Sequence, residues 1–318
     1  MKDFPNIEIS ICIPSYERTE YLERLLHSIT KQTYQNFEVI ISDDSKTNSN
    51  YELIKKFKNL NLKYYKNEIA LDSPKNWNNA IEKANYDWIK IMHDDDFFTD
   101  ENSLLKFAES IRLNPKTEFF FSSYILLNEK NKSKKEIHLS WLIKFLLKKS
   151  RSILFYKNYI GQPSCILFKK DPSNIFDETF KWVVDLEFYF RYLKTRNIYS
   201  YIKEPLVTIS ENETQITKQV FRNRNYEIPE NHKFLEKIGV NSIKNIIIFD
   251  YFWRLYRNLE IKKLSELESF DIKIIPELKK MLAFQSKIHQ WLLKFGAISK
   301  TAMLLCYFYV MNQNKYDN

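Results

Sequence analysis

The sequence contains little glycine: only Gly161, Gly239 and Gly296 occur among its 318 residues. This scarcity excludes a G-x-G-x-x-G fingerprint and a P-loop, in which glycine-rich backbone cradles phosphate groups. If the protein binds a nucleotide, another group must therefore neutralise the phosphates.

Cysteine and long apolar runs are also scarce. The three cysteines are far apart, which gives no zinc site or disulfide framework and fits a reducing compartment. The first residues lack the pattern of a signal peptide. The longest apolar run near the end, Thr301–Met311, is about half of the ~20 residues that a spanning helix needs. We expect a cytoplasmic, soluble protein, with attachment to the inner face of the cell membrane left open.

Positive charge is in excess instead. The chain has 49 Lys and Arg against 40 Asp and Glu, a formal net charge of +9. This surplus suits an anionic partner such as nucleic acid, an acidic membrane face or a phosphorylated substrate, but does not choose among them. A lysine-rich background composition explains it equally well.

Strand and helix patterns alternate over the first 123 residues. Apolar runs typical of strands lie at 7–13, 37–42, 62–65 and 88–92, and helical spacings of apolar residues separate them. In one of these spacings Ser73 and Pro74 have the pattern of an N-cap followed by a proline at the first helical position. The alternation predicts an α/β fold, with a mostly parallel, Rossmann-like sheet and helices on both faces.

Polar residues follow three of these strands, at Ser15–Arg18, Asp43–Asp44 and His93–Asp96. Ligands of open α/β sheets bind outside the carboxyl ends of the strands, so we expect the three clusters to share one crevice. Consecutive aspartates repel unless a cation lies among them, and Mg²⁺ and Mn²⁺ prefer such oxygen ligands. A solvated acidic turn or a helix N-cap is the simpler alternative for Asp94–Asp96.

The segment Ile9–Ser45, ISICIPSYERTEYLERLLHSITKQTYQNFEVIISDDS, resembles the opening of inverting family 2 glycosyltransferases of the GT-A fold. The spacing to Asn76–Asp96, NWNNAIEKANYDWIKIMHDDD, also matches. The resemblance covers residues 7 to 215, and its first hundred residues are specific only as a set. It implies a metal-dependent, inverting transfer of a sugar from a nucleotide-diphosphate sugar.

The resemblance also implies roles for individual residues in binding the nucleotide sugar. The loop along the nucleoside matches Pro14, Ser15, Tyr16 and Arg18, and Glu17 stands where the family often has Asn. Asp44 matches the aspartate that binds the base, with Asp43 beside it, and Asn76 and Asn78 match a polar segment near the sugar and ribose.

The segment His93–Asp96 matches the DXD motif, which holds Mn²⁺ or Mg²⁺ and faces the nucleotide sugar. The usual pattern places acids at the positions of His93, Asp95 and Asp96; because the first is histidine, Asp94 is an alternative ligand. We expect Asp95 or Asp96 to contact the metal most directly.

The catalytic base of the family matches Asp185, with Glu187 the less favoured choice. An inverting transferase needs one base to deprotonate the attacking hydroxyl. The alternative for Asp185 is a helix N-cap, because an apolar helical pattern starts just after it.

Two family features are missing. The stretch 206–218 has no histidine for the metal or diphosphate, so Ser210, Glu211 or Asn212 substitutes or the metal has fewer protein ligands. The QXXRW motif of processive synthases is also absent, which favours transfer of single sugars.

Three regions follow from this interpretation: a nucleotide-sugar half at 1–128, an acceptor half with the base at 129–228, and a helical region at 229–318. The donor we expect is a UDP-sugar, although a dTDP-sugar satisfies the same contact with Asp44. The acceptor we expect is a glycan or lipid-linked glycan of bacterial-type surface polysaccharide or lipo-oligosaccharide synthesis.

Two other classes of protein remain as alternatives. A phosphatase of the haloacid dehalogenase type also uses aspartates after a strand, but its signature needs Thr or Val at Phe98. A non-enzymatic basic module that binds membrane or nucleic acid explains the charge but not acids at strand ends, which would repel nucleic acid. We therefore expect no nucleic-acid partner.

Lysine-flanked apolar segments lie at Ser140–Lys149 and in the tail, at Met281–Phe295 and Ala302–Met311. Such helices can lie on an anionic membrane surface. For 140–149 the membrane or a lipid-linked acceptor is favoured. For the tail, packing on the protein itself or on a second copy as a homodimer is favoured.

Overall fold

The computed structural model describes residues 6–196, 198–212 and 220–313. The chain forms two compact units. Unit 1 comprises residues 1–145, 159–179 and 184–213, and unit 2 comprises residues 146–158, 180–183 and 214–318. The predicted three-region division into 1–128, 129–228 and 229–318 stays a prediction.

The strands all belong to unit 1 and are, in chain order, β1 Ile9–Ser15, β2 Phe37–Asp43, β3 Leu62–Lys66, β4 Trp88–Ile91, β5 Phe97–Phe98, β6 Phe119–Asn128, β7 Lys134–Ile137, β8 Ile166–Lys169 and β9 Ser200–Glu211. The helices up to residue 196 are α1 Thr19–Thr30, α2 Ser49–Ile54, α3 Lys75–Glu82, α4 Ser103–Leu113, α5 Trp141–Lys149, the 3-10 turns η1 Arg151–Phe155 and η2 Pro163–Cys165, and α6 Val184–Arg196. The later helices are α8 Arg224–Ile238, the 3-10 turn η3 Val240–Lys244, α9 Ile246–Asn258, α10 Leu264–Glu268, α11 Pro276–Gln285, α12 Gln290–Lys294 and α13 Gly296–Gln313.

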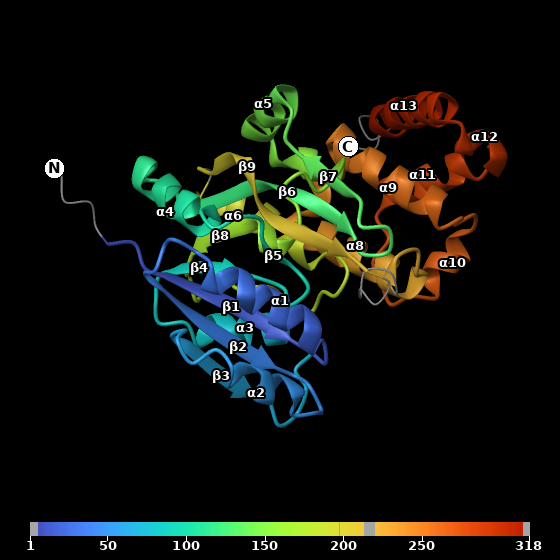
Figure 1. The fold of residues 1–318 in the computed structure, drawn as a ribbon. Coiled ribbons are helices and arrows are strands. Elements are labelled where there is room, and N and C mark those ends of the chain that lie inside the picture. The colour runs from blue at the N-terminus through green and yellow to red at the C-terminus, as the bar shows by residue number, and fades with distance from the viewer. Residues whose placement is uncertain (1–5, 197, 213–219, 314–318) are drawn as a thin grey trace. The chain divides into compact units, whose positions relative to one another are not determined.

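One sheet organises unit 1, with the strand order β3-β2-β1-β4-β8-β6-β9-β5 and with β7 paired to β6 (Figure 1). The four strands β3, β2, β1 and β4 are mutually parallel, as the βα alternation predicts. Beyond β4 the sheet is mixed, because β8 runs antiparallel to both β4 and β6 whereas β9 is parallel to β6. The predicted strands at 7–13, 37–42, 62–65 and 88–92 are confirmed in position.

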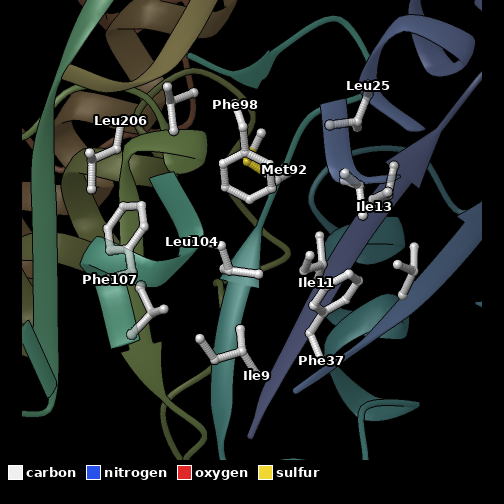
Figure 2. Packing of buried hydrophobic residues seen from close by; sticks show 14 of the residues in the cluster. Ile9, Ile11, Ile13, Leu25, Phe37, Met92, Phe98, Leu104, Phe107 and Leu206 are labelled. Atoms are coloured by element: carbon white, nitrogen blue, oxygen red, sulfur yellow. The ribbon is translucent and has the colours of Figure 1, made fainter. Parts of the chain in front are cut away.

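Alternation along β1 divides its side chains between two faces of the sheet. Ile9, Ile11 and Ile13 lie in one apolar cluster with Leu25 of α1 and Phe107 of α4 (Figure 2). On the other face, the Sγ atom of Cys12 lies 3.5 Å from the carbonyl oxygen of Ala80, in α3. Period-two alternation therefore buries β1 on both faces, which is the environment of a central parallel strand.

The helix α3 begins one residue later than the sequence predicts. Lys75 is its first residue and Pro74 is the N-cap, whereas the predicted cap was Ser73 with Pro74 inside the first turn. The cap position of Pro74 has non-helical dihedral angles, and no side chain caps the helix there.

Unit 2 is helical and built around aromatic side chains. Trp253 and Tyr256 of α9 are buried, and α9 contacts η1, α11 and α13. Phe155 of η1 stacks on Phe234 of α8 with ring centroids 5.1 Å apart. The Trp253 indole N–H donates to the Ser299 hydroxyl at 3.0 Å, which satisfies its polar group inside the core.

A lysine lies in the core of unit 1. Lys90 of β4 is fully buried, and its Nζ lies 5.8 Å and 5.2 Å from the ring centroids of Phe98 and Phe107. The same group donates to the carbonyl oxygens of Ser164 and Ile91. Burial lowers the pKa of Lys90 to about 7, because the charged form loses its hydration.

We predict that Lys90→Met changes how stability depends on pH. Between pH 7 and 10.5 the unfolded chain holds the Lys90 proton and the folded chain has released it, so the parent gains stability as pH rises. The difference in unfolding free energy, parent minus Lys90→Met, should therefore rise through this window by about 1.4 kcal/mol per unit of pKa difference. Urea titrations at several pH values measure it, and a constant or falling difference contradicts the prediction.

Candidate active site

The loop after β1 is fastened to the loops that follow its two neighbouring strands. The backbone N–H of Tyr16 donates to Asp94 at 3.2 Å, and that of Glu17 donates to the Ser45 hydroxyl at 2.7 Å. The Glu17 carboxylate accepts from the backbone of Lys46 at 2.6 Å and from the Thr47 hydroxyl at 2.8 Å. Three loops from different strands are thus joined at the carboxyl edge of the parallel strands.

Glu17 has a backbone φ of 53°, in the left-handed region that asparagine tolerates better than glutamate. The hydrogen bonds of its carboxylate to Lys46 and Thr47 offset the cost of this backbone conformation. The hydrogen bond from Thr47 is the largest cause that lowers the Glu17 pKa. This residue therefore shapes the loop between β1 and α1, although resemblance alone placed it beside the nucleoside.

The guanidinium of Arg18 bridges two acids of the segment after β4. Its Nη1 lies 2.7 Å from an oxygen of Asp95, and its Nη2 lies 2.8 Å from an oxygen of Asp94. Both carboxylates are almost fully buried. Burial raises the Asp94 pKa to about 7, and the neighbouring Arg18 charge opposes that rise.

A candidate metal centre lies in the same segment. Among the described residues, one group of three potential ligands brings its ligand atoms within 4.8 Å of one another: His93, Asp95 and Asp96. His93 Nε2 and Asp96 Oδ2 are buried and have no hydrogen-bond partner in this part of the chain. Buried polar atoms without a partner are costly, so their presence fits a cation held between them. This grouping favours His93, rather than Asp94, as the first position of the motif.

Two residues at the end of β9 support the acids. The Ser210 backbone N–H donates to Asp96 Oδ1 at 3.2 Å, and the Asn212 amide donates to Asp95 Oδ2 at 3.0 Å. Ser210 and Asn212 are two of the three residues that the sequence analysis named as substitutes for the missing family histidine. The third, Glu211, is exposed and pairs with β6 through its backbone, and residues 213–218 of that stretch lie outside the described residues.

Sequence reasoning did not find two polar side chains that hold this segment. Arg24 of α1 donates through Nη2 to the carbonyl oxygen of Asp95 at 2.7 Å and through Nη1 to Glu129 at 2.6 Å. Ser164 of η2 is fully buried, and its hydroxyl accepts the His93 backbone N–H at 2.9 Å. The nearby Ser164 side chain also opposes the rise of the Asp96 pKa that burial causes.

His93 is further fixed by an aromatic contact. Its ring centroid lies 4.7 Å from that of Trp77, in α3. Burial lowers the His93 pKa to about 4, which keeps the imidazole neutral at pH 7, the form that binds metals.

The acids after β2 differ from each other. Asp43 is fully buried and accepts from Ser45, Asn50 and the Tyr64 hydroxyl, so its oxygens hold the loop together. Asp44 accepts the backbone N–H groups of Leu71 at 3.0 Å and Asp72 at 2.9 Å, and the Asn67 amide at 2.8 Å.

The two asparagines of α3 also differ. Asn76 accepts from Asn67 at 3.2 Å, which places it beside the Asp44 network. The Asn78 amide makes three contacts with residues 176–178: it donates to the Phe176 carbonyl and the Glu178 carboxylate, and it accepts the Phe176 N–H. A sugar contact by Asn78 would have to displace one of these bonds.

The two acids of α6 lie in different surroundings. Asp185, half-buried in the first turn, accepts the Leu186 N–H at 2.8 Å. Glu187 is buried and held in a two-point ion pair by Arg191, with distances of 2.7 and 3.0 Å. Arg191 also donates to Asn174 and to the Ile175 carbonyl. Through Arg191, Glu187 thus ties α6 to the loop before it.

A family model described as glycosyl transferase family 2 matches residues 10–176, which is 167 of the 318 residues. The chain belongs to glycosyl transferase family 2. The match includes the loop after β1, the acids after β2 and β4, and Ser164, and it ends before α6.

Curated relatives match shorter stretches. Abequosyltransferase RfbV from Salmonella typhimurium is 38% identical over 93 residues, which are 28% of this chain and 28% of that protein. Poly(ribitol-phosphate) beta-N-acetylglucosaminyltransferase TarS from Staphylococcus aureus is 30% identical over 99 residues, 30% of this chain and 17% of that protein. UDP-Glc:alpha-D-GlcNAc-diphosphoundecaprenol beta-1,3-glucosyltransferase WfgD from Escherichia coli is 26% identical over 120 residues, 38% of this chain and 47% of that protein. Each match spans less than half of the relative's length.

Solved structures share the fold over most of the chain. Residues 1–349 of S. aureus TarS, in complex with UDP-GlcNAc, align over 98% of this chain and 93% of that one, with a TM-score of 0.56 and 14% identity. The mannosyltransferase PcManGT from Pyrobaculum calidifontis, in complex with GDP-Man and Mn²⁺, aligns over 99% and 89%, with a TM-score of 0.57 and 13% identity. The expected GT-A fold class is confirmed.

We predict that Ser164→Ala weakens Mn²⁺ binding measured in the presence of UDP by about 10- to 100-fold, the usual cost of losing a group that orients a metal ligand. The matched control is Ser122→Ala, because the Ser122 hydroxyl of β6 is also buried but has no hydrogen-bond partner among the described residues. Calorimetric titration with Mn²⁺ measures both variants. Equal affinities for Ser164→Ala and Ser122→Ala would show that the Ser164 hydroxyl does not orient the cluster.

Proposed function

We propose that this protein transfers a single sugar from a nucleotide-diphosphate sugar to a hydroxyl group of a glycan acceptor, with inversion at the anomeric carbon. The observation that carries the proposal is the cluster of His93, Asp95 and Asp96 at the carboxyl end of β4, joined to the loop after β1. Ligands of open α/β sheets bind at this edge. Family membership supports the reaction class, and the family match gives no support to a phosphatase or to a non-enzymatic binding module.

The cluster fits Mn²⁺ or Mg²⁺, and its imidazole favours Mn²⁺ because Mg²⁺ prefers ligands that are all oxygen. When bound, the ion would supply Lewis-acid stabilisation of the leaving diphosphate. The protein's own contribution is to hold the ligands in place. Arg18 and Asn212 fix the Asp95 carboxylate, and the Ser210 N–H fixes that of Asp96.

Asp44 is the residue that we assign to the nucleobase. A carboxylate oxygen can accept two hydrogen bonds, and in the described chain the one donor found on Asp44 Oδ2 is the Asp72 N–H. A second donor, the imide N–H of uracil, suits that oxygen. Thymine presents the same group, so this contact supports UDP-sugars and dTDP-sugars alike.

Asp185 is the residue that we assign as the base. Its role is to take the proton of the acceptor hydroxyl as that oxygen attacks the anomeric carbon. The alternative, Glu187, is buried and neutralised by Arg191, so it could take a proton only by giving up that ion pair. Asp185 is less buried than Glu187, which favours it as the acid that meets an acceptor.

For the acceptor we propose a lipid-linked glycan of surface polysaccharide synthesis, which places the protein in the cytoplasm at the inner face of the membrane. The name of the relative WfgD specifies a diphosphoundecaprenol-linked acceptor, which supports this proposal. No helix in the described part of the chain combines the length and the apolar character needed to cross a bilayer.

For the metal, we predict that Asp96→Asn removes the increase in UDP affinity that Mn²⁺ produces. The substitution keeps the shape of the side chain but replaces a charged ligand oxygen. The control is Asp100→Asn, whose carboxylate is partly exposed and caps the Asn102 N–H outside the cluster. Titration of UDP with and without Mn²⁺ measures the effect; an unchanged Mn²⁺ dependence in Asp96→Asn would refute the metal assignment.

For the base, we predict that Asp185→Asn lowers the rate of sugar transfer by about 10²–10⁴ while UDP affinity stays constant, because an amide cannot take the proton. The control is Glu187→Gln, which should lower the melting temperature through Arg191 more than the transfer rate. Transfer assays with a UDP-sugar panel and thermal unfolding together decide between the two acids. Parent-like turnover in Asp185→Asn would move the base elsewhere.

A further inference from the structure

The C-terminal helix α13 is apolar on two sides. One side is buried within unit 2, where Met303, Cys306 and Val310 are inaccessible and α13 contacts α9, α11 and α12. This outcome confirms in part the expectation that the tail packs on the protein itself. The other side of the helix is not covered by the described chain.

The uncovered side continues a set of exposed apolar residues that begins in α12. We call this set the tail stripe, and it consists of Trp291, Phe295, Ile298, Leu305, Phe308 and Tyr309. Each is between 44% and 60% exposed. In α13, the spacings between the successive residues 298, 305, 308 and 309 are seven, three and one. At 3.6 residues per turn, these spacings place all four on one face of the helix. Aromatic residues of this kind are rarely gathered on a free surface without a partner.

The charged residues of the segment that carries the tail stripe all have one sign. From Leu278 to Gln313 the sequence contains five lysines and no aspartate or glutamate. Lys287 and Lys294 are exposed, and Lys294 lies between Trp291 and Phe295 in the sequence. Lys300 pairs with Asp250 at 3.0 Å, so its charge is partly offset.

We infer that the tail stripe binds the surface of an anionic lipid bilayer, with α12 and α13 lying in the plane of the interface. Apolar and aromatic side chains enter the boundary between headgroups and acyl chains, and lysines pair with anionic headgroups. A second copy of the chain is a poorer occupant, because it would bring two sets of lysines together with no acid from this segment to neutralise them.

This inference rests on the proposed function for its purpose, since a lipid-linked acceptor would be met at that surface. The evidence for membrane binding is independent of the proposed function. Binding to lipid is measured without donor, metal or acceptor, so loss of membrane binding and loss of sugar transfer are separate results.

The test is co-sedimentation of the full chain with vesicles of phosphatidylglycerol and phosphatidylcholine, against vesicles of phosphatidylcholine alone. We expect binding to the anionic vesicles that weakens with salt. One double variant combines Leu305→Ser with Phe308→Ser, and a second combines Lys287→Glu with Lys294→Glu. Each should weaken binding to the anionic vesicles by at least about tenfold. Thermal unfolding of each variant shows whether the fold is retained.

The helix α5 provides the matched control. It also exposes two aromatic residues, Trp141 and Phe145, near Lys144 and Lys148. The variant Trp141→Ser, Phe145→Ser should bind vesicles like the parent. Loss of binding in that variant alone would transfer the surface to α5, in line with the expectation for residues 140–149, and overturn the inference.

Two other results would also overturn it. One is failure of the parent to bind anionic vesicles. The other is a stable dimer in sedimentation velocity that Leu305→Ser, Phe308→Ser dissociates, because the tail stripe would then be the contact between two copies.

Discussion

The burial of three consecutive carboxylates at the end of β4 is the constraint on which the site depends. Asp94, Asp95 and Asp96 are each at most 4% exposed. Moving a carboxylate out of water costs several kcal/mol unless charges and hydrogen bonds replace the hydration. The chain supplies these from two places: Arg18 and the Tyr16 N–H in the loop after β1, and Ser210 and Asn212 at the end of β9.

This compensation is incomplete at two atoms of the candidate metal centre. The Oδ2 atom of Asp95 accepts from both Arg18 and Asn212, whereas His93 Nε2 and Asp96 Oδ2 have no hydrogen-bond partner among the described residues. A site that needed only structural stability would satisfy these two atoms as well. Their proximity to each other and to Asp95 favours a metal centre over an acidic turn, which was the simpler alternative from the sequence.

The scarcity of glycine and the presence of the acidic cluster are related. A glycine-rich loop binds phosphate through backbone N–H groups, but in this chain the N–H of Tyr16 donates to Asp94 and that of Glu17 to Ser45. These two backbone N–H groups of the loop after β1 therefore bind protein side chains and do not point to a phosphate. In the proposed function, neutralisation of the diphosphate is therefore assigned to a cation held by the acids.

The sequence predicted most of this arrangement because its signals are local. Strand alternation located β1 to β4, and the end of each strand located the polar loops, since residues just after parallel strands must meet at one edge. That argument places the acidic segment Asp94–Asp96 at the edge, and the family resemblance singled out Asp95 and Asp96 within it. The N-cap of α3 was misplaced by one residue, a common error because helix ends depend on local dihedral angles.

Residues that act through distant contacts could not be predicted in this way. Ser164 lies in a 3-10 turn about seventy residues after His93, and nothing in its neighbours Pro163 and Cys165 marks it as a partner of the metal segment. Lys90 left a weak signal, a lysine inside the apolar run Trp88–Met92, but its partner is again Ser164. The antiparallel pairing of β8 with β4 brings the two segments together.

The topology therefore decides when the site can form. The parallel strands β1 to β4 carry the acids, yet the groups that support them arrive with η2 and with the end of β9, more than a hundred residues later for Ser210 and Asn212. Contacts over such distances in sequence close long loops and form late in folding. Until β9 pairs with β6, the three carboxylates lack part of the compensation that their burial requires. The acidic segment and the end of β9 are thus expected to order together, which couples completion of the sheet to formation of the candidate active site.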